Sequence, residues 1–231
     1  MLGRGLFVLL ALGLGAVAQQ APMQLSSLGT SAFTTLANPR FPNHRIRIKQ
    51  SAFCDPTINV YTGYLDVDEG AKHLFFYFFE SRRDPAKDDV VMWINGGPGV
   101  GVGFSYADFG ETVETTEDAA KNIYSFISLF FEAFPQYEGR GLHLSGESYG
   151  GRYLPIFASK IYDQNKLAEA AGGKVINLKS VIIGNGITDI STLYPGRYEI
   201  ECGRAALDVP FQTIGNRVRM KQALARCQKL M

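Results

Sequence analysis

The chain has 231 residues, 46% of them hydrophobic, and its 23 basic and 22 acidic side chains leave a net charge of +1. This balance gives no indication of a nucleic-acid partner, because such partners are bound by a concentrated positive surface. The length suits one domain with a sizeable core. Cys54, Cys202 and Cys227 form an odd set, so at least one thiol is free or paired with another chain.

The first 18 residues have the pattern of a secretory signal peptide. Arg4 supplies a positive charge, residues 6–14 form an apolar core, and Ala16-Val17-Ala18 is a cleavage site of small residues. The apolar core is too short to cross a bilayer and no later segment is long enough, so we expect an exported protein without a membrane span. Residues 19–50 have only a weak hydrophobic pattern. They form either a pro-segment or an ordered N-terminal arm, and the sequence does not decide between the two.

Strand patterns follow. Residues 60–67 suit a strand, and residues 73–80 (HLFFYFFE) and 90–94 are almost continuous apolar runs of strand length. Continuous apolar runs are typical of strands in a sheet that is covered on both faces. We therefore expect such a sheet here.

Helices and strands then alternate. Residues 115–134 repeat apolar residues at three- and four-residue spacing, with Thr115 as the N-cap, Asp118 reaching back to it, and Pro135 after the last turn. A strand at 142–144, a helix from Tyr149 to about residue 164 and a strand at 181–183 complete an α/β pattern with a parallel sheet. The pattern loosens after residue 189, and residues 218–231 suit a basic helix.

Gly146-Glu147-Ser148-Tyr149-Gly150 follows an apolar strand and opens a helix. This is the G-x-S-x-G pattern of a nucleophile elbow, in which a serine is held in a strained conformation with its hydroxyl exposed. The chemistry is acyl transfer: Ser148 attacks a carbonyl, forms an acyl-enzyme, and water hydrolyses it. The N–H of Tyr149 is expected to donate to the oxyanion. A plain strand-to-helix turn, with the serine capping the helix, is the alternative.

A second turn, Asn95-Gly96-Gly97-Pro98-Gly99, follows the strand at 90–94. Hydrolases of the lipase kind take their other oxyanion N–H from such a turn, and Gly97 suits that role. A phosphate-binding loop is excluded, since neither G-x-G-x-x-G nor G-x-x-x-x-G-K-[ST] fits residues 96–103. The triad order of this fold places an acid and then a histidine after the serine, yet His44, His73 and His143 all precede Ser148.

Together, Trp-x-Asn-Gly-Gly-Pro-Gly and Gly-Glu-Ser-Tyr-Gly-Gly-Arg-Tyr resemble the serine carboxypeptidase family, of the vacuolar carboxypeptidase Y kind. Further segments resemble the family as well: residues 61–65, 79–82, 100–106 and 183–186. The resemblance implies an α/β-hydrolase fold and a serine-type carboxypeptidase of the vacuole or the extracellular space. It implies neither a metal nor an organic cofactor.

The resemblance also implies that Asn95, Gly96 and Glu147 bind the free C-terminal carboxylate of a peptide or protein substrate. Two adjacent carboxylates repel each other unless one holds a proton, so Glu147 is expected to favour peptide hydrolysis at acidic pH. The partner would be a peptide C-terminus.

The chain also departs from the family. Gly99 runs directly into Val100, where family members carry some tens of residues that include most of a central strand, and family members continue well beyond residue 231. Cys202 resembles a family cysteine whose partner position holds Arg217. We therefore expect a partial α/β-hydrolase fold that lacks C-terminal strands and part of the central sheet, with its core in residues 51–190 and the start of a cap or insertion region in 191–231.

Two other functions stay open. The chain is alternatively an inactive truncated carboxypeptidase homologue, or a gene-model fragment, that at most binds peptides. The second alternative is an esterase of the lipase kind, although no lid pattern is evident. Without the general base of the triad, we expect the printed chain to hydrolyse peptides negligibly. Without most of a central strand, whose loss exposes unpaired backbone and apolar surface, we expect it to fold poorly.

Overall fold

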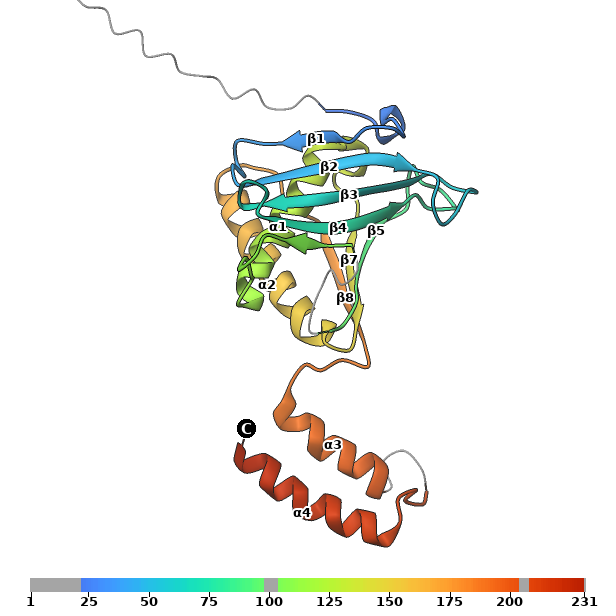
Figure 1. The fold of residues 1–231 in the computed structure, drawn as a ribbon, viewed down its shortest axis with the longest axis vertical. Coiled ribbons are helices and arrows are strands. Elements are labelled where there is room, and N and C mark those ends of the chain that lie inside the picture. Colours follow the sequence, from blue (N-terminus) through green and yellow to red (C-terminus); the bar gives the residue numbers. More distant parts are fainter. Residues whose placement is uncertain (1–21, 98–103, 204–207, 231) are drawn as a thin grey trace, which may run out of the picture.

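A computed structural model describes residues 22–97, 104–203 and 208–230 (Figure 1). The predicted signal peptide (1–18) and the Gly99–Val100 join lie outside the described residues. The strands are β1 (Thr34–Ala37), β2 (His44–Ser51), β3 (Val60–Val67), β4 (Lys72–Phe79), β5 (Val90–Ile94), β6 (Tyr106–Ala107), β7 (Leu142–Glu147) and β8 (Leu178–Gly184). The helices are α1 (Thr116–Ala133), α2 (Gly150–Ala170), α3 (Ile190–Cys202) and α4 (Ile214–Leu230).

The first sheet is antiparallel, in the order β1-β2-β3-β4-β6. Its first two strands come from the weakly patterned N-terminal region, and β2 pairs with β3 along its whole length, across residue 50. Ile46 and Ile48 of β2 are fully buried, whereas Arg45, Arg47 and Lys49 alternate with them. These three basic residues therefore lie on one face of β2, and the other face of the strand enters the core.

A buried carboxylate lies in this sheet. Asp66 of β3 is 2% exposed and accepts hydrogen bonds from Arg47 Nε at 2.6 Å and from His73 Nδ1 at 2.5 Å. Burial raises the pKa of Asp66, but the hydrogen bonds and charges of Arg47 and His73 outweigh burial and hold that pKa below its usual value. Three neighbouring strands are thus joined by one ionised group.

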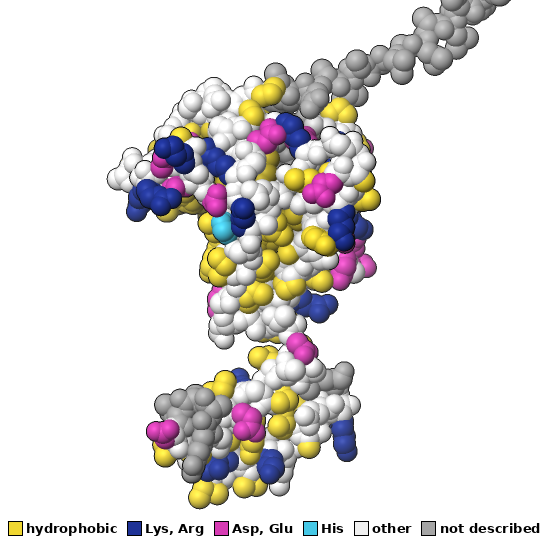
Figure 2. Space-filling model, turned by 180° about the vertical axis from the view of Figure 1, so that it is seen from behind, with side chains coloured by type: hydrophobic (Ala, Val, Ile, Leu, Met, Phe, Trp, Pro, Cys, Tyr) yellow, Lys and Arg dark blue, Asp and Glu magenta, His cyan; other side chains and the backbone are white. Residues whose placement is uncertain are grey.

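The second sheet is parallel, in the order β5-β7-β8, as the α/β alternation predicts. The chain passes through this sheet from one edge to the other, in the order β5, β7, β8. Because both crossover connections are right-handed, α1 and α2 lie on the same face of the sheet. The other face carries Val91, Trp93 and Ile182, which are 62%, 60% and 52% exposed. The expectation of a sheet covered on both faces is therefore wrong for this sheet within the described residues. Figure 2 shows hydrophobic side chains gathered over the body that holds the sheets.

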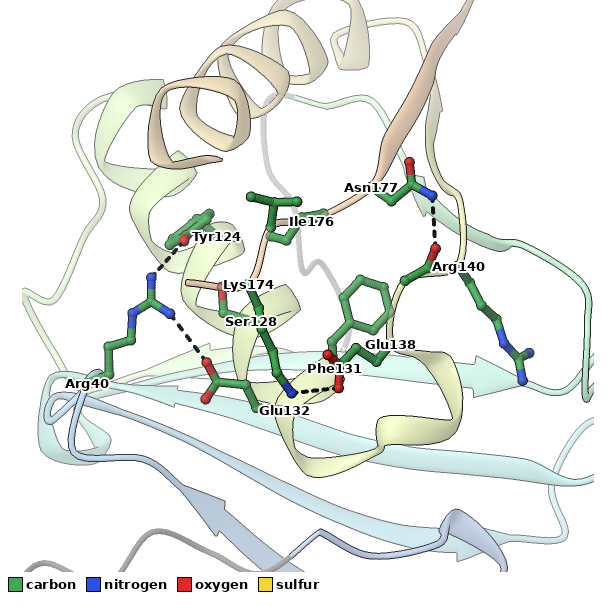
Figure 3. Close-up of a pocket in the computed structure, with 12 residues that line it drawn as sticks. Arg40, Tyr124, Ser128, Phe131, Glu132, Glu138, Arg140, Lys174, Ile176 and Asn177 are labelled. Carbon is green, nitrogen blue, oxygen red and sulfur yellow. Dashed lines mark hydrogen bonds and ion pairs between the residues drawn. The ribbon is translucent and has the colours of Figure 1, made fainter. Parts of the chain in front are cut away.

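Helix α1 begins and ends as predicted. The N–H of Asp118 donates to Thr115 Oγ1 at 3.1 Å, and Pro135 follows the helix. Figure 3 shows how Arg40 joins the N-terminal region to this helix, through Glu132 at 3.4 Å and the hydroxyl of Tyr124 at 3.3 Å. The pocket drawn there holds about 40 Å³, which suits one or a few water molecules rather than an organic ligand.

Helices α3 and α4 form a hairpin that lies apart from the sheets in Figure 1. Cys202 is buried between them, with its Sγ 3.6 Å from Met220 Sδ. Cys54 and Cys227 are free thiols like Cys202. None of the helices in the described segments has the length and apolar character that a membrane crossing requires.

Candidate active site

Ser148 lies at the turn between β7 and α2, with φ +56°. A non-glycine residue rarely adopts this left-handed conformation, which is strained and persists only where neighbours hold it. Three backbone hydrogen bonds hold it here: Ser148 N–H donates to Gly184 O at 3.1 Å, and Ser148 O accepts from Ile187 N–H at 2.8 Å and from Gly151 N–H at 3.0 Å. The strand–turn–helix geometry predicted for the elbow is confirmed.

The turn after β5 packs directly on this elbow. A Cβ atom on Gly96 would lie 2.7 Å from Ser148 Cβ, 2.8 Å from Glu147 O and 3.0 Å from Tyr149 N. Only glycine therefore allows the two turns to approach this closely. Tyr149 precedes the first residue of α2, where N–H groups lack intrahelical acceptors. Gly97 is exposed, next to residues that the structure does not describe.

Asn95 follows β5, and Glu147 is the last residue of the adjacent parallel strand β7. Ile94 of β5 pairs with Gly146 of β7, so Asn95 and Glu147 each come one residue after a paired position at the same edge of the sheet. Trp93 Nε1–H donates to Asn95 Oδ1 at 2.7 Å. Because the indole N–H can only donate, this bond assigns the amide oxygen of Asn95 to the side of Trp93. Glu147 is exposed.

None of the three histidines, all of which lie in described parts of the chain, bonds to Ser148. His143 is five residues earlier on β7, about 16 Å along a strand, and its ring nitrogens contact Ser180 Oγ at 2.7 Å and Asp89 Oδ2 at 3.2 Å. His44 contacts Asn122, and His73 contacts Asp66. Within the described residues, therefore, the elbow serine has no histidine bonded to it, and these residues hold no cluster suited to a metal ion.

Sequence reasoning assigned no role to Gly151 or Ile187, which support the elbow from behind. A Cβ atom on Gly151 would lie 2.8 Å from both Ile187 N and Thr188 Oγ1, and 2.9 Å from Gly186 Cα. The signal was present in the paired glycines after Tyr149 and in the Gly-Asn-Gly turn after β8, since glycines are common where two backbones meet.

The neighbouring glycines provide a matched test of this packing. We expect Gly151→Ala to lower the free energy of unfolding by about 1–3 kcal/mol, because backbone of the loop after β8 must move. Gly150→Ala is the control: its Cβ would meet Ile94 O at 3.6 Å, an ordinary contact. Urea unfolding of both variants measures the difference, and equal stability would show that the loop does not clamp the elbow.

Comparison with known proteins shows which family this chain resembles in sequence. The sequence profile described as serine carboxypeptidase matches residues 51–100 and 99–229. Carboxypeptidase Y homolog A of Emericella nidulans is 37% identical over an alignment covering 80% of this chain and 40% of that protein. Its counterpart in Talaromyces stipitatus is 38% identical, covering 77% of this chain and 38% of the relative. The chain thus spans about 40% of the length of these relatives.

The alignments also contain an internal gap. The Emericella nidulans alignment has 231 positions but includes 80% of the 231 residues here, about 185, so about 46 of its positions have no counterpart in this chain. The family profile matches in two parts that meet at residues 99 and 100. Both observations agree with the predicted internal deletion at the Gly99–Val100 join.

A solved structure supports the fold. The prohormone-processing carboxypeptidase Kex1(delta)p from Saccharomyces cerevisiae matches with a TM-score of 0.50 and 21% identity, over 84% of this chain and 49% of that one. Its likeness bears on the fold alone. The profile match covers most of the sequence, and the nucleophile elbow has the expected shape. The chain belongs to the serine carboxypeptidase family and has part of its α/β-hydrolase fold.

Proposed function

We propose that this chain carries the nucleophile and the carboxylate-binding half of a serine carboxypeptidase site. Ser148 attacks the carbonyl of the last peptide bond, and the N–H groups of Tyr149 and Gly97 stabilise the oxyanion. The C–N bond then breaks, the C-terminal amino acid leaves with the serine proton on its amine, and water hydrolyses the acyl-enzyme. The observation that carries this proposal is the strained φ of Ser148, held between Gly184 and Ile187. Strain of this kind clusters at functional sites.

The exopeptidase character is assigned to Asn95, Gly96 and Glu147. The amide nitrogen of Asn95 and the N–H of Gly96 donate to the substrate carboxylate, and a protonated Glu147 donates a further hydrogen bond. Since a charged Glu147 would repel that carboxylate, hydrolysis is favoured at acidic pH. The signal-peptide pattern of residues 1–18 supports the secretory pathway, with a vacuolar or extracellular destination.

Peptide binding without turnover is the second candidate function. It is favoured by one observation: all three histidines of the printed sequence are engaged away from Ser148. Saturable binding of a peptide by the 231-residue chain, with no release of amino acids, would support it.

The test uses a chimera in which the Emericella nidulans relative supplies its intervening segment at the Gly99–Val100 join and its remaining length after Met231. Its substrates are one peptide with a free C-terminus and the same peptide amidated. We expect stepwise release of C-terminal residues from the free peptide and at least about a 100-fold slower reaction with the amide, because a charged hydrogen-bond partner is lost. Equal rates on both would contradict the carboxylate site.

A further inference from the structure

A cleft opens between the two sheets. On one side, the outer edge of β4 pairs with β6 only at Lys72 and His73. On the other side, β5 pairs with β7, and no described strand pairs with its opposite edge. The cavity between the two edges has a volume of about 1410 Å³. This exceeds the ~300–1,000 Å³ of ordinary small-molecule pockets, so the space fits a larger occupant.

The edge of β4 directs backbone groups into this cleft. Phe75 N–H donates to Ser105 Oγ at 2.9 Å on the cleft side. Because alternate residues of a strand direct their N–H and C=O groups to the same edge, those of Tyr77 and Phe79 are also directed there. Phe76 has the opposite direction, and its carbonyl is 3.5 Å from Thr62 Oγ1 on β3.

The free edge of β5 also directs backbone groups into the cleft, from the side opposite β4. Val90 N–H donates to Gly141 O at 2.8 Å, on the side of β7. By the same alternation, the N–H and C=O groups of Val91 and Trp93 are directed to the cleft. Two rows of backbone donors and acceptors therefore face each other across the cavity.

The floor of the cleft is aromatic and aliphatic. Phe76 and Phe78 of β4 pack on Phe126 and Phe130 of α1, with ring centroids 4.9 and 5.1 Å apart, and Met92 of β5 lines the same space. A lipid or small apolar molecule could cover these side chains but would leave both backbone edges without hydrogen-bond partners. An added strand satisfies the edges and the floor together.

Both sides of the Gly99–Val100 join meet this cavity, since Asn95 before it and Ser105 after it line the cleft. The family profile breaks at this join, and about 46 positions of the Emericella nidulans alignment have no counterpart in this chain. We propose that the cleft is a strand-addition site, and that it binds in trans an extended, apolar segment of the stretch that the relatives carry at this point. The proposal does not require catalysis at Ser148, although Asn95 and Tyr149 line the cleft as well.

The experiment mixes the purified chain with overlapping peptides of about ten residues, which tile that stretch of the Emericella nidulans relative. Amide hydrogen exchange is followed by NMR. We expect one peptide, or two that overlap, to slow exchange at Tyr77, Val91 and Trp93 by about 100-fold when its concentration is 100 times its Kd. Phe76 and Met92, whose groups face β3 and β7, change little.

Two controls make the result specific. A scrambled peptide of the same composition should not bind, and N-methylation at alternate residues of the binding peptide should weaken it by about tenfold or more, because strand hydrogen bonds are lost. Three outcomes would overturn the proposal: no peptide binds, binding leaves Val91 and Trp93 unprotected as an apolar ligand would, or the same amides are already protected in a dimer of the chain.

Discussion

In the chimera that carries the relative's missing segments, Ser148→Ala is expected to lower kcat/KM by about 10⁴–10⁶-fold, because the side chain that forms the acyl-enzyme is removed. What remains would come from binding and oxyanion stabilisation alone. Release of C-terminal residues from an unblocked peptide measures the loss. A variant that keeps more than about one per cent of the activity would place the nucleophile elsewhere.

Ser148→Gly supplies the control for folding. Glycine adopts positive φ without strain, so this variant should be as inactive as the alanine variant but more stable than it by about 1–3 kcal/mol. Urea unfolding of the 231-residue chain measures this independently of catalysis. Equal stability of the two variants would show that the φ of +56° carries no strain.

Asp66→Asn is expected to destabilise the chain by about 3–5 kcal/mol at pH 7, because a positive charge on Arg47 loses its buried partner. The carboxylate is 2% exposed and contacts Arg47 and His73 directly. Asp68→Asn is the matched control. The side chain of Asp68 is 50% exposed and pairs with Lys72, and exposed ion pairs contribute about 1 kcal/mol or less.

The contribution of Asp66 to the free energy of unfolding should also decrease as the pH falls. The folded-state pKa of Asp66 is lowered, so its contribution is present above the unfolded value of about 3.9 and is lost as pH falls through the lowered folded value. The stability difference between the wild type and Asp66→Asn should therefore shrink as urea unfolding is repeated below about pH 4. A difference that stays constant there would show that the carboxylate is not ionised in the native state.

The sequence predicts elements best where period and termini agree. Residues 60–67, 90–94 and the capped α1 match closely, because apolar spacing and a local cap point to the same bounds. β2 is missed because its outward residues are basic and conceal a two-residue period. α3 is missed because Pro195 and Gly196 lower its helix propensity.

The candidate site follows the same rule. The elbow at Ser148 and the close glycine at Gly96 are local features, so the sequence displays them. The clamp by Ile187 joins residues about forty positions apart, and the uncovered sheet face depends on which elements are absent around it. Neither can be derived from spacing along the chain, because each is a property of tertiary packing.

The exposed side chain at the end of β5 has a spectroscopic consequence. Trp93 is the single tryptophan of the sequence, it is 60% exposed, and its indole is bonded to Asn95 beside the elbow. Its fluorescence therefore reports one location without any label, with the long-wavelength emission of a hydrated indole. A polypeptide that covers this face of the sheet, or a ligand that rearranges Asn95, would register in the emission of one residue.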